Sequence, residues 1–221
     1  MELMEIFKQL DTQIFLAING LHSPFFDQFM FVVSEKVIWI PLYISVLYLV
    51  IKHWKREAIW IILALIICVL ISDQIASGFL KHLVKRLRPS HVDDLKGLIH
   101  LVKGYSGGMY GFASSHAANA FGFAILSSLL FKQKTYTYSI IAWALITAYS
   151  RIYLGVHYPM DVIGGALVGV IAALICYWLI NKYRPSLTNH DVYGVIEMST
   201  WIVPISVLGL SFLGIIVFSI F

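Results

Sequence analysis

The sequence predicts an all-α membrane protein, a bundle of about six transmembrane helices that follows an amphipathic N-terminal segment. Hydrophobic residues make up 59% of the 221 residues, and charged residues make up only 13%. The mean hydropathy is +0.81, far above that of a soluble domain. Apolar runs follow one another without a long polar stretch between them. We therefore expect a single integral membrane domain over residues 1–221.

The N-terminal segment, residues 1–30, has apolar residues at helical spacing, interrupted at Asn19-Gly20 and Ser23-Pro24. This pattern favours one or two amphipathic helices lying in the membrane interface. The first residues, MELMEIFKQLD, carry acids in place of a basic region. They therefore predict that no signal peptide is cleaved.

About six apolar runs are candidate membrane spans, because a transmembrane helix needs about 20 mainly apolar residues. They cover residues 38–51, 58–80, 117–131, 136–149, 162–180 and 201–221. Basic clusters follow the first, third and fifth spans, and the positive-inside rule places these clusters in the cytoplasm. The extramembrane loop 86–113 then lies on the opposite face. Its length and its glycines predict a functional loop.

Polar residues gather at that opposite face in three separate stretches. KHLVKRLRP ends the second span, ASSH begins the third, and SRIYLGVHYPMD joins the fourth span to the fifth. Ionisable residues at a membrane boundary are costly and usually serve a function. Span parity therefore predicts one site built from all three stretches.

The first stretch contains Lys81 and Arg88, which are seven residues apart and so lie on one stripe if the helix continues. Pro89 disfavours helix at Arg88, so we expect the helix to end there. The pair is either an anion clamp or a basic flank that snorkels to the interface. Lys85 and Arg86 fit the flank better.

The second stretch places Ser114, Ser115 and His116 at the entrance of the third span. Serine before a helix is commonly an N-cap, and a helix N-terminus also binds phosphate through its free N–H groups. The glycines of the preceding KGYSGGMYG allow close backbone approach, although glycine is ordinary in loops.

In the third stretch, Pro159 suits the first position of the fifth helix, which places Asp161 in its first turn. Asp161 can then bond one imidazole nitrogen of His157 and leave the other free as a nucleophile or base. Arg151 offers a planar fork for phosphate oxygens. The alternative is a structural His–Asp pair at a helix cap.

Together these residues suit a phosphate dianion that cations hold while two histidines divide the chemistry. No carboxylate cluster accompanies the histidines, so we expect no metal and no cofactor. No nucleic-acid signature is present. Cys68 and Cys176 lie in apolar runs as expected for buried free thiols. Asp73, in the second span, either pairs with a polar residue of another helix or supports the site.

The combined pattern resembles the type 2 phosphatidic acid phosphatase superfamily, which includes membrane lipid phosphatases and the vanadium haloperoxidases. The residues that carry the resemblance are Lys81, Arg88-Pro89, Ser114-Ser115-His116, Ser150-Arg151, His157 and Asp161. The middle motif departs from the family, because Ala113 and Ser115 stand where proline and glycine are usual.

The resemblance implies a division of roles. His157 would attack phosphorus to form a phosphohistidine, Asp161 would orient His157, and His116 would protonate the leaving oxygen and later activate water. The residues that would hold the phosphate oxygens are Lys81, Arg88, Ser114, Ser115 and Arg151.

The expected function is therefore that of a membrane lipid phosphatase. Possible substrates are undecaprenyl pyrophosphate, lipid A phosphate, phosphatidylglycerol phosphate and phosphatidate. The expected location is a bacterial inner membrane, with the site facing the periplasm or exterior. A lipid phosphotransferase with the same intermediate and a non-enzymatic phosphate-binding membrane protein are alternatives. The sequence leaves the oligomeric state open.

Overall fold

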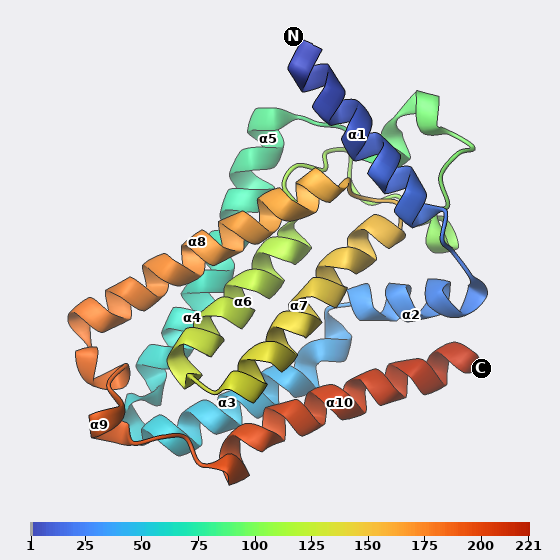
Figure 1. The fold of residues 1–221 in the computed structure, drawn as a ribbon. Coiled ribbons are helices and arrows are strands. Elements are labelled where there is room, and N and C mark those ends of the chain that lie inside the picture. The colour runs from blue at the N-terminus through green and yellow to red at the C-terminus, as the bar shows by residue number, and fades with distance from the viewer. Residues whose placement is uncertain (1) are drawn as a thin grey trace.

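The computed structural model describes residues 2–221, including their side chains except those of residues 2–4, 190 and 191. Over this range the regular structure is helical, and the only β-type pairing is an isolated bridge between Leu87 and Tyr110. The predicted all-α class is confirmed. Figure 1 shows the helices gathered into one bundle, with α1 lying across one end of it.

The N-terminal segment forms two helices, α1 (Glu2–Asn19) and α2 (Pro24–Ser34). Ser23 is the N-cap of α2, because its Oγ accepts a hydrogen bond from the Phe26 N–H at 3.3 Å. Pro24 follows at the first helical position, where its missing N–H costs nothing.

Each predicted span coincides with a helix of the bundle. The helices are α3 (Ile40–Trp54), α4 (Ala58–Asp73), α6 (Ser115–Phe131), α7 (Lys134–Tyr153), α8 (Pro159–Tyr183) and α10 (Met198–Ile220). Three segments are long and apolar enough to cross a membrane: Val37–Val84, which contains α3 and α4, Pro159–Tyr183 and Met198–Ile220. Ser115–Phe131 is apolar but shorter. The chain is thus an integral membrane protein, and the number of its spans stays a prediction.

The end of the second predicted span differs from the expectation. After α4 the helix continues as a π-helical segment, η3 (Gln74–Leu80), and a short α5 (Lys81–Val84). It ends at Lys85, whose φ of 51° is left-handed. Arg88 lies beyond it in an extended conformation, which its position before Pro89 favours. The prediction that Lys81 and Arg88 share one helical stripe is therefore wrong.

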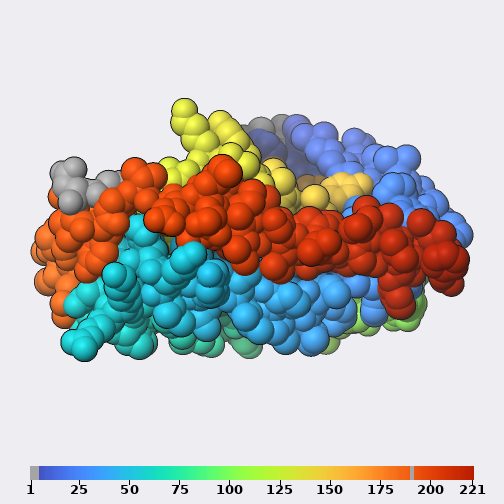
Figure 2. Space-filling model, turned by 90° about the horizontal axis from the view of Figure 1, so that it is seen from below, coloured from blue at the N-terminus to red at the C-terminus, as the bar shows by residue number. Residues whose placement is uncertain are grey.

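Helices α6 and α8 cross closely at the centre of the bundle. A Cβ at Gly165 would lie 2.2 Å from the Ser114 carbonyl oxygen, and one at Gly169 would lie 2.2 Å from that of Ala118. No side chain fits at either distance, so both positions require glycine. The two glycines thus allow α6 and α8 to pack closely. On the face seen in Figure 2, α10 runs along the molecule beside α3.

Polar and thiol side chains inside the bundle are placed as expected. Cys68 and Cys176 are buried free thiols. Asp73 on α4 accepts a hydrogen bond from Asn119 Nδ2 on α6 at 3.0 Å. Asp73 therefore belongs to a polar pair between two helices.

The long loop contains three 3₁₀ turns, Pro89–His91, Asp93–Leu95 and Val102–Gly104. The N-terminal helices hold this loop against the end of α7. Asn19 Nδ2 donates to the His100 carbonyl at 2.9 Å and to the Tyr153 carbonyl at 2.8 Å. The three polar stretches of the sequence, which are the end of α5, the start of α6 and the α7–α8 junction, all lie near this loop at one end of the bundle (Figure 1).

Candidate active site

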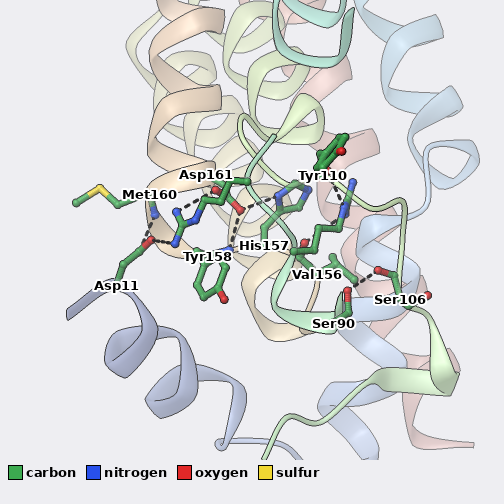
Figure 3. A network of polar contacts seen from close by, with 11 residues as sticks. Asp11, Ser90, Ser106, Tyr110, Val156, His157, Tyr158, Met160 and Asp161 are labelled. Atoms are coloured by element: carbon green, nitrogen blue, oxygen red, sulfur yellow. Dashed lines mark hydrogen bonds and ion pairs between the residues drawn. The ribbon is translucent and has the colours of Figure 1, made fainter. Parts of the chain in front are cut away.

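The turn before α8 places a histidine and an aspartate together. Tyr158 is the N-cap of α8, Pro159 takes the first helical position and Asp161 the third. Asp161 Oδ2 accepts hydrogen bonds from the Tyr158 N–H at 3.0 Å and from His157 Nδ1 at 3.3 Å (Figure 3). This contact holds the proton on Nδ1 and leaves Nε2 with a free lone pair.

Positive charges surround the buried His157. Its imidazole is 1% exposed and interacts electrostatically with Arg88, Arg151 and Lys81. Burial, followed by these cations, lowers the pKa of His157 well below its usual value. The imidazole is therefore neutral near pH 7, as a nucleophile must be.

Arg88 is fixed by the backbone of two segments. Its Nε donates to the Tyr110 carbonyl at 3.1 Å, and its Nη1 donates to the Val156 carbonyl at 3.3 Å. Gly107 lies directly against it: a Cβ there would be 2.7 Å from Nη1, and its φ of +67° also favours glycine. The glycine-rich loop thus lets the backbone close over a buried cation.

Arg151, at the end of α7, has partners that the sequence did not indicate. Its Nη1 donates to Ser34 Oγ at the end of α2, and its Nη2 donates to the Tyr105 hydroxyl at 3.3 Å. Its Nε is buried without a hydrogen-bond partner. A buried unpaired donor in an otherwise ordered group suggests a ligand that completes it.

The serine motif lies at the N-terminus of α6. Ser114 is the N-cap residue, but its hydroxyl makes no capping hydrogen bond and is buried without a partner. Its backbone N–H donates to the Asp161 carbonyl at 2.9 Å. The side-chain capping interpretation is therefore wrong, and the free hydroxyl beside a helix N-terminus suits an anion. Ser115 begins the helix, and His116 follows it.

The remaining predicted residues lie within electrostatic range of one another. His116 interacts with His157, Arg151 and Lys81, and Lys81 also interacts with Arg88 and Asp161. The structure thus brings the three motifs together at one end of the bundle.

The prediction that Arg86 is only a basic flank of the span is wrong. Its Nη1 lies 3.2 Å from Asp161 Oδ1, and its Nη2 lies 2.7 Å from Asp11 Oδ2 on α1. Its guanidinium also covers the Tyr158 ring at 3.9 Å. Arg86 therefore belongs to the polar network behind the dyad of His157 and Asp161.

Two cavities meet beside His116. A cavity of 340 Å³ with a mixed lining includes Arg151, Tyr105 and His116. A mainly apolar cavity of 520 Å³ extends between α3, α4, α6 and α7. Ser34, Lys36 and His116 line both, so the cavity beside Arg151 adjoins the apolar one. Among the described residues, no group of three or more His, Cys, Asp or Glu side chains is placed to hold a metal ion.

Comparisons with known proteins agree with this geometry. Residues 57–185 match the model of the PAP2 superfamily. The chain is 40% identical to the lipid A 4′-phosphatase of Bacteroides thetaiotaomicron, over 85% of this chain and 84% of that protein. It is 38% identical to the lipid A 4′-phosphatase of Porphyromonas gingivalis, over 79% and 74% of the two chains. The crystal structure of Aquifex aeolicus LpxE superposes with a TM-score of 0.61 at 25% identity, covering 76% of this chain and 94% of that one.

Proposed function

Because this chain belongs to the PAP2 superfamily and is a membrane lipid phosphatase, we propose that its substrate is the 4′-phosphate of lipid A. Two relatives of similar length at 40% and 38% identity carry that activity in their names. The reaction is hydrolysis of a phosphate monoester to inorganic phosphate and the free sugar hydroxyl. It requires a phosphate site that adjoins space for acyl chains.

One observation carries this proposal: His116 lies where the 340 Å³ cavity lined by Arg151 and Lys36 meets the 520 Å³ apolar cavity. A lipid with its phosphate between the two histidines can extend its apolar part away from them, between the helices. The free Ser114 Oγ and Arg151 Nε supply donors for the phosphate oxygens. Lys81, Arg88 and the N-terminus of α6 add positive charge around the same oxygens.

In the first step, His157 Nε2 attacks phosphorus and forms a P–N bond while the bond from phosphorus to the 4′ oxygen breaks. Burial, followed by neighbouring cations, lowers the pKa of His116 in the free protein, and the negative charge of the bound phosphate favours the protonated form. Protonated His116 then gives its proton to the departing oxygen, which would otherwise leave as an alkoxide. Asp161 stabilises the positive imidazole ring through Nδ1–H. The cationic groups bind the equatorial oxygens more strongly as charge develops on them.

In the second step, His116, now neutral, takes a proton from water as the water oxygen attacks phosphorus. The P–N bond breaks, inorganic phosphate departs, and His157 returns to its neutral form. Each histidine thus ends the cycle in the protonation state in which it began. No metal ion takes part.

We place the site on the periplasmic side of a bacterial inner membrane. The basic clusters at residues 52–56, 131–134 and 181–184 lie at the C-terminal ends of α3, α6 and α8, which are at the end of the bundle remote from the α7–α8 junction (Figure 1). The positive-inside rule assigns that remote end to the cytoplasm.

The experiment is a comparison of lipid phosphates with the purified full chain in vesicles. We expect the highest kcat/KM for bis-phosphorylated lipid A, with mass spectrometry showing loss of the 4′-phosphate and retention of the 1-phosphate. Higher kcat/KM for undecaprenyl pyrophosphate, phosphatidylglycerol phosphate or phosphatidate would refute the assignment. Addition of an acceptor alcohol should yield no phosphorylated acceptor, and its formation would indicate a phosphotransferase.

A further inference from the structure

The N-terminal helix α1 reaches the catalytic dyad through one buried carboxylate. The Asp11 side chain is 2% exposed, and its Oδ2 lies 2.7 Å from Arg86 Nη2. Arg86 Nη1 in turn lies 3.2 Å from Asp161 Oδ1. Asp11 Oδ1 also accepts a hydrogen bond from the Met160 N–H at 3.0 Å, at the start of α8 (Figure 3). One planar guanidinium therefore joins α1 to the carboxylate that orients His157.

Helix α1 also constrains the guanidinium of Arg86 through the Tyr158 ring. The guanidinium lies over the Tyr158 ring at 3.9 Å, and Phe15 of α1 packs edge-on against the same ring at a centroid distance of 5.4 Å. Phe15 is fully buried, so α1 fixes both the ring beneath Arg86 and the carboxylate beyond it. A planar fork with several donors is suited to bridge two carboxylates, which the single ammonium of lysine cannot do in this geometry.

Arg86 also limits which partners Asp161 can take. Arg88 interacts electrostatically with Asp161, and so does Lys81. With Arg86 on Oδ1, the other oxygen, Oδ2, is held toward His157 Nδ1. Release of Arg86 would free Asp161 to turn toward another cation, and His157 would lose the contact that directs its Nε2 at phosphorus.

One exposed side of α1 is apolar. Its exposed large apolar residues are Ile6, Phe7, Leu10 and Ile14, at 57%, 51%, 47% and 42%, beside a polar side that exposes Glu5, Lys8, Gln9 and Gln13. Most of these apolar residues are four residues apart and so share one side of the helix. The adjoining start of α8 also exposes apolar side chains, since Met160 is 41% and Ile163 51% exposed. Helix α8 is long and apolar enough to cross a membrane, and Met160 contacts α1 directly. The apolar face of α1 thus continues the lipid-facing surface of α8.

We propose that the bilayer surface seats α1, and that α1 is a positioning element which holds Arg86 on Asp161 through Asp11. Turnover then depends on α1 being bound to the membrane. This inference rests on the proposed roles of Asp161 and His157. Its experiments compare each variant with the parent on one lipid phosphate. If the proposed substrate were wrong, the parent enzyme would fail to hydrolyse it. If the proposed dyad were wrong, the His157→Ala variant would remain active. Both results would be seen before any change is made to α1.

The first experiment neutralises the link. Asp11→Asn keeps an oxygen for the Met160 N–H but removes the charge that holds Arg86. We expect kcat to fall roughly 10-fold, as for other groups that orient a site residue through a second contact, with KM unchanged. Glu5→Gln is the matched control, because Glu5 is an exposed acid of the same helix whose partner is the exposed Lys8. Unchanged kcat in Asp11→Asn would overturn the proposal.

The second experiment unseats the helix. Phe7→Gln combined with Leu10→Gln should lower kcat in vesicles to a similar extent. Adding Asp11→Asn to this pair should cause no further loss, because both changes break the same connection. Losses that multiply would show that the apolar face acts independently of Asp11, and would overturn the proposal.

Two further measurements keep the test decisive if Asp11→Asn folds poorly. Arg86→Lys retains the charge but cannot bridge both carboxylates, so we expect a similar fall in kcat, and a kcat equal to that of the parent would contradict the link.

A spin label at Leu10→Cys should be more accessible to oxygen than to a water-soluble nickel complex, and one at Glu5→Cys should show the opposite. The native cysteines are buried and will not interfere. Greater nickel access at residue 10 would contradict bilayer seating.

Discussion

Gly111 provides a sharp test of how the loop backbone positions the dyad. A Cβ at this position would lie 2.6 Å from Asp161 Oδ2, about 0.8 Å closer than ordinary van der Waals contact. That oxygen also accepts the hydrogen bonds of His157 Nδ1 and the Tyr158 N–H. Gly111→Ala must therefore move either the loop or the carboxylate by close to that amount.

The expected cost follows from that displacement. Misplacement of a reacting group by about 1 Å can reduce the rate about 10²-fold. We predict that Gly111→Ala lowers kcat on a lipid phosphate by about this factor, because His157 loses its orienting contact. KM should change much less, since the atoms nearest a Cβ at Gly111 belong to Asp161 and to the aliphatic part of Arg88.

Gly108→Ala is the matched control, because a Cβ at Gly108 in the same loop would have no neighbour within 4 Å. Both variants should be purified with equal yield and similar thermal stability, so that a difference in kcat reports geometry. Our reasoning would be refuted if Gly111→Ala kept kcat within about twofold of Gly108→Ala. That result would mean that the dyad tolerates a shift which the structure says it cannot.

Further predictions concern the chemistry, the ionisation and the orientation of the site. His157→Ala should abolish turnover of every substrate. His116→Ala should lower the rate on a lipid monophosphate about 10²–10⁴-fold, yet keep a first turnover on nitrophenyl phosphate, whose leaving group needs no proton. Equal losses of rate in the two variants on both substrates would contradict divided roles. Activity should persist in excess EDTA, and vanadate should inhibit as a five-coordinate mimic of the transition state; loss of activity that magnesium restores would argue against a metal-free reaction. Because the pKa of His157 is lowered, its imidazole should stay neutral as the pH falls through 6.5, and NMR of labelled histidine, with His157→Gln for assignment, should show protonation only at lower pH. Cysteines at Lys96→Cys and Lys134→Cys should label from opposite sides of the membrane, the first from outside; labelling of position 96 only after permeabilisation would reverse the orientation.

The helices and the meeting of the motifs could be predicted because both depend on local pattern. Apolar runs of bilayer length locate the helices, and Pro159 with Asp161 two residues later sets the start of α8. Span parity then brings the ends of distant helices to one face. The stripe assigned to Lys81 and Arg88 failed because a left-handed Lys85 ends the helix earlier. Lysine is not a residue that marks such a turn, so the sequence carried no signal for it.

The missed residues act through contacts between elements that are far apart in the chain. Ser34 and Tyr105 bind Arg151 from the end of α2 and from the loop, and neither belongs to a motif. Asp11 occupies one position of an amphipathic helix that also carries exposed polar residues, and only the tertiary structure shows that it is buried. Arg86 was interpreted as a flank because basic residues are common at span ends. Its role depends on two carboxylates, Asp11 and Asp161, each of which is 75 residues from Arg86 in the chain, and no local pattern connects them.

The spacing between the two histidine motifs depends on backbone contacts more than on the catalytic side chains. The Ser114 N–H donates to the Asp161 carbonyl at 2.9 Å, which joins the start of α6 directly to the start of α8. Gly165, one turn further along α8, lies under the Ser114 carbonyl, where a Cβ would be 2.2 Å away. The two helices can cross this closely only because that Cβ is missing. Any side chain at Gly165 would separate the helix that carries His116 from the turn that carries His157, and the two histidines could no longer act on one phosphorus atom.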